Sequence, residues 1–140
     1  MDDIALMREI NRLEGKIDAL RTIEVGGVWQ DWTPTLSTVS GSITSYTASG
    51  SYCLIGNGGM MTVKLVITNN GTGAGAIFAT LPFTISYRSM LIGRDDAITS
   101  NVVIGRIDGN MNRISIIDYE GAYPAQTGSE INLSGIFRIA

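Results

Sequence analysis

The first 24 residues carry an apolar seam that constrains what the rest of the chain can do. Ile10, Leu13, Ile17 and Leu20 recur at spacings of three, four and three residues, and Leu6 extends the seam backwards. These are the a and d positions of a heptad repeat, and most residues between them are charged or polar. One narrow apolar stripe on a solvated helix needs a partner helix. We therefore predict a short coiled coil between identical chains. The alternative is an amphipathic helix folded back on its own domain.

The seam leaves open how many helices associate. Isoleucine at a with leucine at d favours two strands in parallel coils. In-register parallel pairing would also bring together like charges, Glu9 with Glu14 and Lys16 with Arg21. Gly15 costs the helix roughly 1 kcal/mol relative to alanine. So short a coil is marginal alone, and we expect the domain behind it to supply most of the association energy.

Charge is distributed unevenly along the 140 residues. Ten of the 23 charged residues lie in residues 1–24, so the remainder is poor in charge for a monomeric domain. We predict a stalk helix at residues 1–24, a hinge at 25–28 and a β head at 29–140. The net charge of −3 gives no sign of the basic surface that binds nucleic acid or anionic lipid. We expect no membrane insertion and no signal peptide, because no apolar run approaches about 20 residues and the N-terminus is acidic and amphipathic.

The head is a series of short runs rich in β-forming residues, separated by glycine, asparagine and serine. In one run Val63, Leu65 and Ile67 share a face, as do the alternate apolar residues of Glu130–Ile139. Asp108-Gly-Asn is typical of a tight hairpin turn. This pattern predicts a mainly β fold, an antiparallel β-sandwich or jelly-roll-like head. The predicted strands are Ser42–Ala48, Ser51–Ile55, Met61–Thr68, Ala76–Leu81, Arg88–Gly93, Val102–Ile107, Arg113–Asp118 and Glu130–Ile139.

Two tryptophans at the start of the head have two interpretations. Trp29 and Trp32 either pack where the stalk meets the head or form a platform on which a sugar stacks. We favour packing. Cys53 is the only cysteine and lies in an apolar run, so we expect a buried small hydrophobe and no disulfide.

Catalytic and metal-binding signatures are absent from the sequence. The chain has no histidine, which removes the commonest general base and metal ligand. Residues 108–112 begin like a calcium loop, but Arg113 stands where glycine is needed and Tyr119 where the bidentate glutamate belongs. The carboxylates of Arg94-Asp-Asp and Asp118-Tyr-Glu fit solvated loops better than a glycosidase pair. We expect no enzyme activity, no metal and no cofactor.

Several short motifs occur in a characteristic order. Trp32-Thr-Pro-Thr-Leu opens the head, followed by Gly50-Ser-Tyr-Cys-Leu-Ile-Gly-Asn, Leu81-Pro-Phe-Thr and a final run from Ile131 to Ile139. Over roughly Trp29–Ala140 this order resembles the C-terminal β domains of phage and prophage tail fibres, tailspikes and baseplate receptor-binding proteins. The chain departs from that pattern at Phe137, where tyrosine is common, and at Gly58-Gly59-Met60.

The resemblance implies a homotrimer on a virion tail or baseplate, assembled in the bacterial cytoplasm. It implies contact with bacterial surface polysaccharide through the head and with other tail proteins through the N-terminus. A trimer would override the two-strand preference of the seam. It would also explain the charge-poor head, because three copies would bury flanking faces.

Planar polar groups beside an aromatic face are typical of saccharide sites, and loops on a rigid β scaffold can supply both. We therefore predict a glycan-binding, non-enzymatic receptor-binding module. The alternatives are a structural virion subunit without glycan affinity and, less favoured, a depolymerase. The candidate ligand-binding residues are Arg94, Asp95, Asp96, Asn110, Asn112, Tyr119 and Tyr123, and the candidate oligomerisation residues are Leu6, Ile10, Leu13, Ile17 and Leu20.

Overall fold

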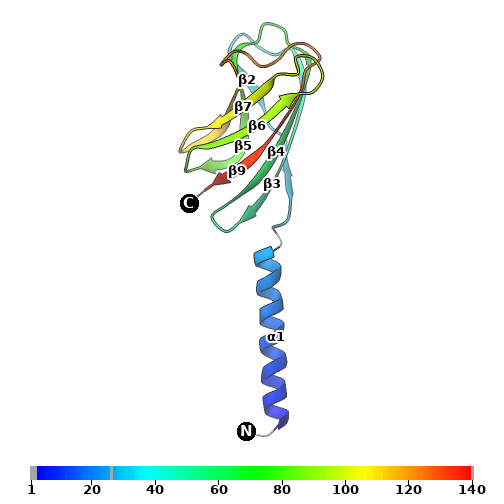
Figure 1. Ribbon diagram of the computed structural model, residues 1–140, viewed down its shortest axis with the longest axis vertical. Coiled ribbons are helices and arrows are strands. Elements are labelled where there is room, and N and C mark those ends of the chain that lie inside the picture. Colours follow the sequence, from blue (N-terminus) through cyan, green and yellow to red (C-terminus); the bar gives the residue numbers. More distant parts are fainter. Residues whose placement is uncertain (1–2, 26, 140) are drawn as a thin grey trace.

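The computed structural model describes residues 3–25 and 27–139, and helical side chains as far as residue 16. Helix α1 spans Asp3–Val25 and points away from a β head (Figure 1). The predicted N-terminal helix is confirmed. Leu6, Ile10 and Leu13 are 47%, 40% and 46% exposed in the single chain. Ile17 and Leu20 lie outside the described side chains, and the coiled coil stays a prediction.

The head contains the β-strands expected from the alternating apolar pattern, with two further short strands at its start. Its mainly β class is confirmed. The strands of the described chain are β1 (Gln30–Trp32), β2 (Leu36–Ser40), β3 (Ser45–Ile55), β4 (Gly58–Asn69), β5 (Ala74–Ile85), β6 (Ser89–Asp95), β7 (Val102–Ile107), β8 (Met111–Asp118) and β9 (Glu130–Arg138).

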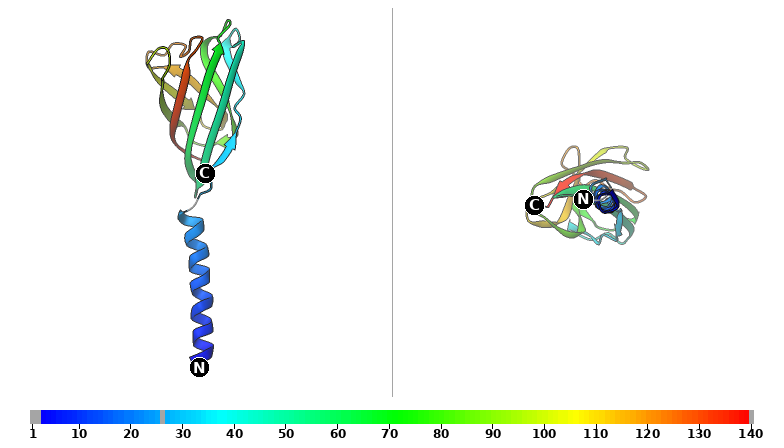
Figure 2. Two further views of the ribbon diagram at one scale, coloured as in Figure 1. Left: turned by 90° about the vertical axis from the view of Figure 1, so that its right-hand side faces the viewer. Right: turned by 90° about the horizontal axis from the view of Figure 1, so that it is seen from below.

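These strands form one antiparallel sheet in the order β1-β3-β4-β9-β6-β7-β8-β5-β2. The sheet curls so that, seen from below, its strands surround a common interior (Figure 2). The two edge strands are consecutive in the chain. The indole Nε1 of Trp32 in β1 donates to the carbonyl of Thr80 in β5 at 2.9 Å, and the amide of Thr80 donates to the carbonyl of Thr35 at 3.1 Å. The segment from β1 to β2 thus joins the two ends of the sheet.

The head differs from the predicted sandwich in being one continuous curled sheet. Three of its strands are 11 or 12 residues long, so right-handed twist accumulates along them and bends the sheet onto itself. The predicted strands Ser42–Ala48 and Ser51–Ile55 merge into β3. Gly50 continues that strand and leaves room for Trp32, since a Cβ at Gly50 would lie 2.6 Å from the indole ring.

The concave side of the sheet encloses the hydrophobic core. Val63, Leu65 and Ile67 are at most 2% exposed, which confirms their predicted shared face. Ile131, Leu133 and Phe137 of β9 are buried likewise, while Gly135 is half-buried, and each such apolar side chain contributes roughly 1.5–3 kcal/mol through burial. Trp32 packs against this core, so the packing interpretation is confirmed for Trp32. Trp29 is 49% exposed, and Cys53 is buried and unpaired, as predicted.

Candidate functional site

The head has two ends, and the structure divides the predicted ligand-binding residues between them. The end nearer α1, the stalk end, contains the turns after β3, β5 and β7. The opposite end, the far end, contains residues 41–44, 70–73, 96–101 and 119–129 (Figure 1). Arg94, Asp95, Asp96, Tyr119 and Tyr123 belong to the far end. Asn110 and Asn112 belong to the stalk end and cannot share a site with the others.

Asn110 has a structural role in the predicted hairpin turn, which is confirmed. Its φ is +64°, and the amide of Met111 donates to the carbonyl of Asp108 at 3.2 Å. Asparagine tolerates this left-handed conformation better than most residues. The turn therefore accounts for Asn110 without a ligand.

Asp95 is fully buried and anchors the loop between β6 and β7. Its Oδ1 accepts from the amides of Ala97, Ile98 and Glu130 at 3.1–3.3 Å. Its Oδ2 accepts from the amide and hydroxyl of Thr99 and, at 2.6 Å, from the hydroxyl of Ser129. The prediction of a solvated carboxylate is wrong for Asp95. Six donors hold it in place, and no carboxylate oxygen is left for a ligand.

These donors also set the pKa of Asp95. Burial raises the pKa, because it penalises the charged form, but the hydrogen bonds from Ser129 and from the amides of residues 97–99 outweigh burial. The pKa falls to about 2. Asp95 is therefore an ionised structural anchor at neutral pH.

Asp118 and Tyr123 also hold the loop between β8 and β9 in place through hydrogen bonds. Asp118 is 8% exposed, and its Oδ1 accepts from the amides of Glu120 and Ala122 at 2.9 and 2.8 Å. The solvated-loop prediction is therefore wrong for Asp118 as well. The Tyr123 hydroxyl donates to Asn70 Oδ1 at 2.5 Å and ties two far-end loops together, while burial raises the pKa of Tyr123.

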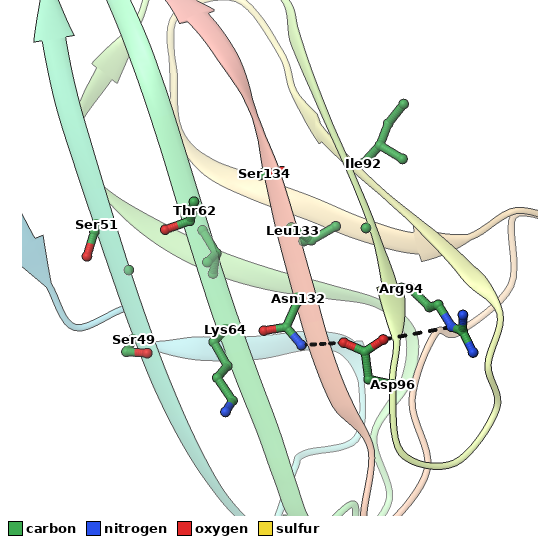
Figure 3. A pocket seen from close by; sticks show the side chains of 13 residues that line it. Ser49, Ser51, Thr62, Lys64, Ile92, Arg94, Asp96, Asn132, Leu133 and Ser134 are labelled. Carbon is green, nitrogen blue, oxygen red and sulfur yellow. Dashed lines mark hydrogen bonds and ion pairs between the residues drawn. The ribbon is translucent and has the colours of Figure 1, made fainter.

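Two exposed candidates of the far end, Arg94 and Asp96, line a groove on the outer face of the sheet. The groove has a volume of about 440 Å³ and crosses β3, β4, β9 and β6 (Figure 3). Strand pairing aligns Ser49 with Lys64, Lys64 with Asn132, and Asn132 with Arg94. We call these four residues the polar row. Because four neighbouring strands span three spacings of about 4.8 Å, the polar row is roughly 14 Å long.

The polar row presents donors and acceptors in a fixed arrangement. Asn132 Nδ2 donates to Asp96 Oδ2 at 2.7 Å, and Arg94 Nε lies 3.8 Å from Asp96 Oδ1. Figure 3 shows Asp96 between these two side chains, with Lys64 on the neighbouring strand. Within the described part of the chain, Lys64 has no hydrogen-bond or ion-pair partner. Its ammonium can donate to a ligand oxygen without breaking an existing contact.

Tyr119 extends this surface with an aromatic side chain. Its amide donates to the carbonyl of Val102 at 3.0 Å, and Val102 pairs with Arg94. Tyr119 is 58% exposed. The hydrogen bond with Glu120 and the negative charge of that residue raise the pKa of Tyr119, so its phenol stays protonated. Arg94, Asp96 and Tyr119 are thus the predicted residues that the structure brings to one exposed surface.

Sequence reasoning missed Ser49, Lys64 and Asn132. Each is a polar residue at an alternating position of a strand, which by itself marks only a solvent-facing side. Their alignment depends on the pairing of β3 with β4, its neighbour in the chain, and of β4 with β9, which is distant in sequence. The available signal was the outward polarity of each strand, and it does not give the register between strands.

Within residues 3–25 and 27–139, no group of three or more histidine, cysteine, aspartate or glutamate side chains could hold a metal ion. No helix in the described residues combines the length and apolar character needed to cross a bilayer.

Comparisons with known proteins agree with the fold. No protein-family model matches the chain, and no curated protein does. The structure is similar to the crystal structure of the Dettilon tailspike protein, with a TM-score of 0.61 and 19% sequence identity. The match covers 80% of this chain and 24% of the tailspike chain, so this chain corresponds to about a quarter of that protein's length. At this identity the similarity shows a shared fold.

Proposed function

We propose that this chain is a phage tail receptor-binding module, carried on the virion, that binds a bacterial cell-surface glycan through its head. The observation that carries the proposal is the polar row on the outer face of the sheet, with Tyr119 in the far-end loop beyond it. The fold shared with part of a tailspike protein supports it.

The chemistry of this surface suits a hydroxyl-rich ligand. Asn132 and Arg94 are planar groups that engage sugar hydroxyls at fixed angles, and Asp96 can accept hydrogen bonds while holding both in position. Tyr119 offers a ring against which the apolar face of a sugar can pack. A groove open across four strands accommodates an extended saccharide chain better than it accommodates a small compact ligand.

We propose binding without catalysis. Retaining and inverting glycosidases need two carboxyl groups free to exchange protons or attack carbon. Asp95 and Asp118, the buried carboxylates of the far end, are instead used as hydrogen-bond acceptors for loop amides. Replacing either with asparagine is expected to destabilise the head, and we expect no polysaccharide hydrolysis from the wild-type chain or from either variant.

The helix supports assembly into a homotrimer. Its described seam residues lack a partner in the single chain, and parallel association would place three heads side by side. Three weak sites held together gain avidity from high effective concentration. In this arrangement the N-terminal end of the stalk would contact other tail proteins.

The test is binding of the intact chain to purified bacterial surface polysaccharides by calorimetry. Asn132→Ala should weaken binding about tenfold or more, since loss of hydrogen bonds worth about 1.4 kcal/mol has that effect. Ser37→Ala, an exposed position on β2, is the matched control. The proposal fails if no surface polysaccharide binds the wild-type chain, or if Asn132→Ala binds as the wild type does.

A structural virion subunit is the second candidate. The unpartnered seam of α1 favours it, because that seam could equally bind a helix of another tail protein. This subunit would form a complex of two different proteins through α1 and show no glycan affinity. Substitution of Ile10 with Asp would then abolish the complex, whereas Asn132→Ala would leave it intact.

A further inference from the structure

The outer face that carries the polar row changes character towards the stalk end. Four large apolar side chains are exposed there: Ile136 at 73%, Ile92 at 63%, Met90 at 48% and Met60 at 41%. We call these four residues the stalk-side patch. They come from β4, β9 and β6, which are neighbours in the sheet. A contiguous apolar surface of this kind on a folded head marks an interaction site.

Strand pairing shows that the patch is continuous. Met60 pairs directly with Ile136, and Ile92 pairs with Ser134, two residues before Ile136 on the same face. Met90 and Ile136 also line one shallow hollow between β6 and β9. Arg88 and Arg138 form its rim, so the surface has an apolar centre and a polar edge, as protein interfaces do.

The connection from the helix reaches the head at this same row of residues. Cys53 pairs with Met60, so Cys53, Met60 and Ile136 form one row across β3, β4 and β9. Gly27 lies against Cys53, and a Cβ at Gly27 would collide with Sγ and lie 2.6 Å from the carbonyl oxygen of Leu54. Helix α1 therefore leaves the head beside Cys53, at one end of the row whose other members, Met60 and Ile136, belong to the patch.

We propose that the stalk-side patch is the contact surface between heads, and that its occupant is the head of a second copy of this chain. Parallel association of α1 through its seam brings the stalk ends of neighbouring heads together. The patch adjoins the point where α1 enters the head, so it is an apolar surface placed to meet a neighbour. The polar row lies farther from the stalk, and Ile92, which belongs to the patch, also lines the groove at its stalk side. The inference rests on the homotrimer in the proposed function and adds which surface forms it.

The experiment measures association of the full chain by light scattering and analytical ultracentrifugation over a range of concentrations. Ile136→Asp and Met90→Asp each put a charge in the patch. Val39→Asp is the matched control, because Val39 is 61% exposed on β2, on another part of the sheet. Circular dichroism and thermal melts check that all three variants fold. Since both patch side chains are already exposed in the single chain, neither substitution disturbs the core.

We expect the concentration at which each patch variant dissociates to be at least tenfold higher than the concentration at which the wild type or Val39→Asp dissociates. The inference is overturned if the patch variants associate as Val39→Asp does, or if the wild-type chain is a monomer throughout. Measuring glycan binding by Ile136→Asp tests the proposed glycan binding independently of the proposed interface. A dissociated variant that still binds soluble saccharide supports both. Dissociation of the patch variants, in a chain whose wild type binds no polysaccharide, supports the interface and overturns glycan binding.

Discussion

Asp95 links the structure of the far end to the response of the head to pH. Its pKa of about 2 in the folded chain lies below its ordinary value near 3.8. A carboxyl group with a lowered folded pKa stabilises the fold when ionised. This contribution is fully present above pH 4 or so and is lost as the pH falls towards and below 2. The difference corresponds to about 2 kcal/mol.

We therefore predict that the free energy of unfolding decreases by about 2 kcal/mol through this group as the pH falls from 6 to 1. Asp95→Asn should lose comparable stability at pH 6 and show a flatter pH profile, measured by urea unfolding. Asp96→Asn, at the exposed neighbouring position, is the control and should cost less than 1 kcal/mol. An Asp95→Asn profile parallel to the wild type would contradict this account of the anchor.

Gly93 is a second residue on which the site depends. It lies in β6 opposite Leu133 and lines the groove. A Cβ there would collide with the carbonyl oxygen of Asn132 and lie 2.6 Å from its carbonyl carbon. The atoms in the way are backbone atoms, so β6 and β9 would have to separate.

We predict that Gly93→Ala destabilises the head by roughly 1–3 kcal/mol, the usual range for overpacking, and weakens glycan binding by displacing Asn132. Thermal unfolding and calorimetry measure the two effects. Thr62→Ala, which removes atoms from the same groove wall, should leave stability within about 0.5 kcal/mol. A fully stable Gly93→Ala chain would show that the two strands can move apart at little cost.

At the scale of the elements, helix α1 contains Gly15, a residue that is unfavourable within a helix. Gly15 lies within the helix, and no atom lies within 4 Å of a Cβ built there. Gly15→Ala should therefore stabilise the helix by about 1 kcal/mol. Circular dichroism should show more helix, and the assembled chain should dissociate at lower concentration. Unchanged helicity would mean that the helix is already fully formed at this position.

The elements themselves were largely predictable, because alternation and heptad spacing are local properties of the sequence. Val63, Leu65 and Ile67 are buried as their spacing indicated, and the turn at residues 108–110 forms where Asp-Gly-Asn predicts it. The candidate site was only partly predictable. Lys64 and Asn132, 68 positions apart in the chain, become neighbours through pairing of β4 with β9, and no local pattern specifies that register. The burial of Asp95 likewise depends on Ser129, a distant residue.

At the scale of the whole molecule, the helix and the head both contribute to association in the proposed trimer. Ile10→Asp places a charge in the seam at a position that is 40% exposed in the single chain. We predict that it weakens association at least tenfold, measured by light scattering, without changing the melting of the head. Arg8→Asp, a charge change outside the seam, is the control. Equal association of Ile10→Asp and wild type would exclude the seam from the interface.

The segment that joins the two ends of the sheet has a mechanical consequence. Any pull transmitted through α1 enters the head at β1, whose strand runs antiparallel along β3. Ladder hydrogen bonds are perpendicular to their strands, so a pull along β1 loads those bonds together in shear instead of opening them one at a time. Beyond β1 the chain continues into β2, paired with β5 at the other end of the sheet. Tension on the stalk is thus shared between both edges of the head.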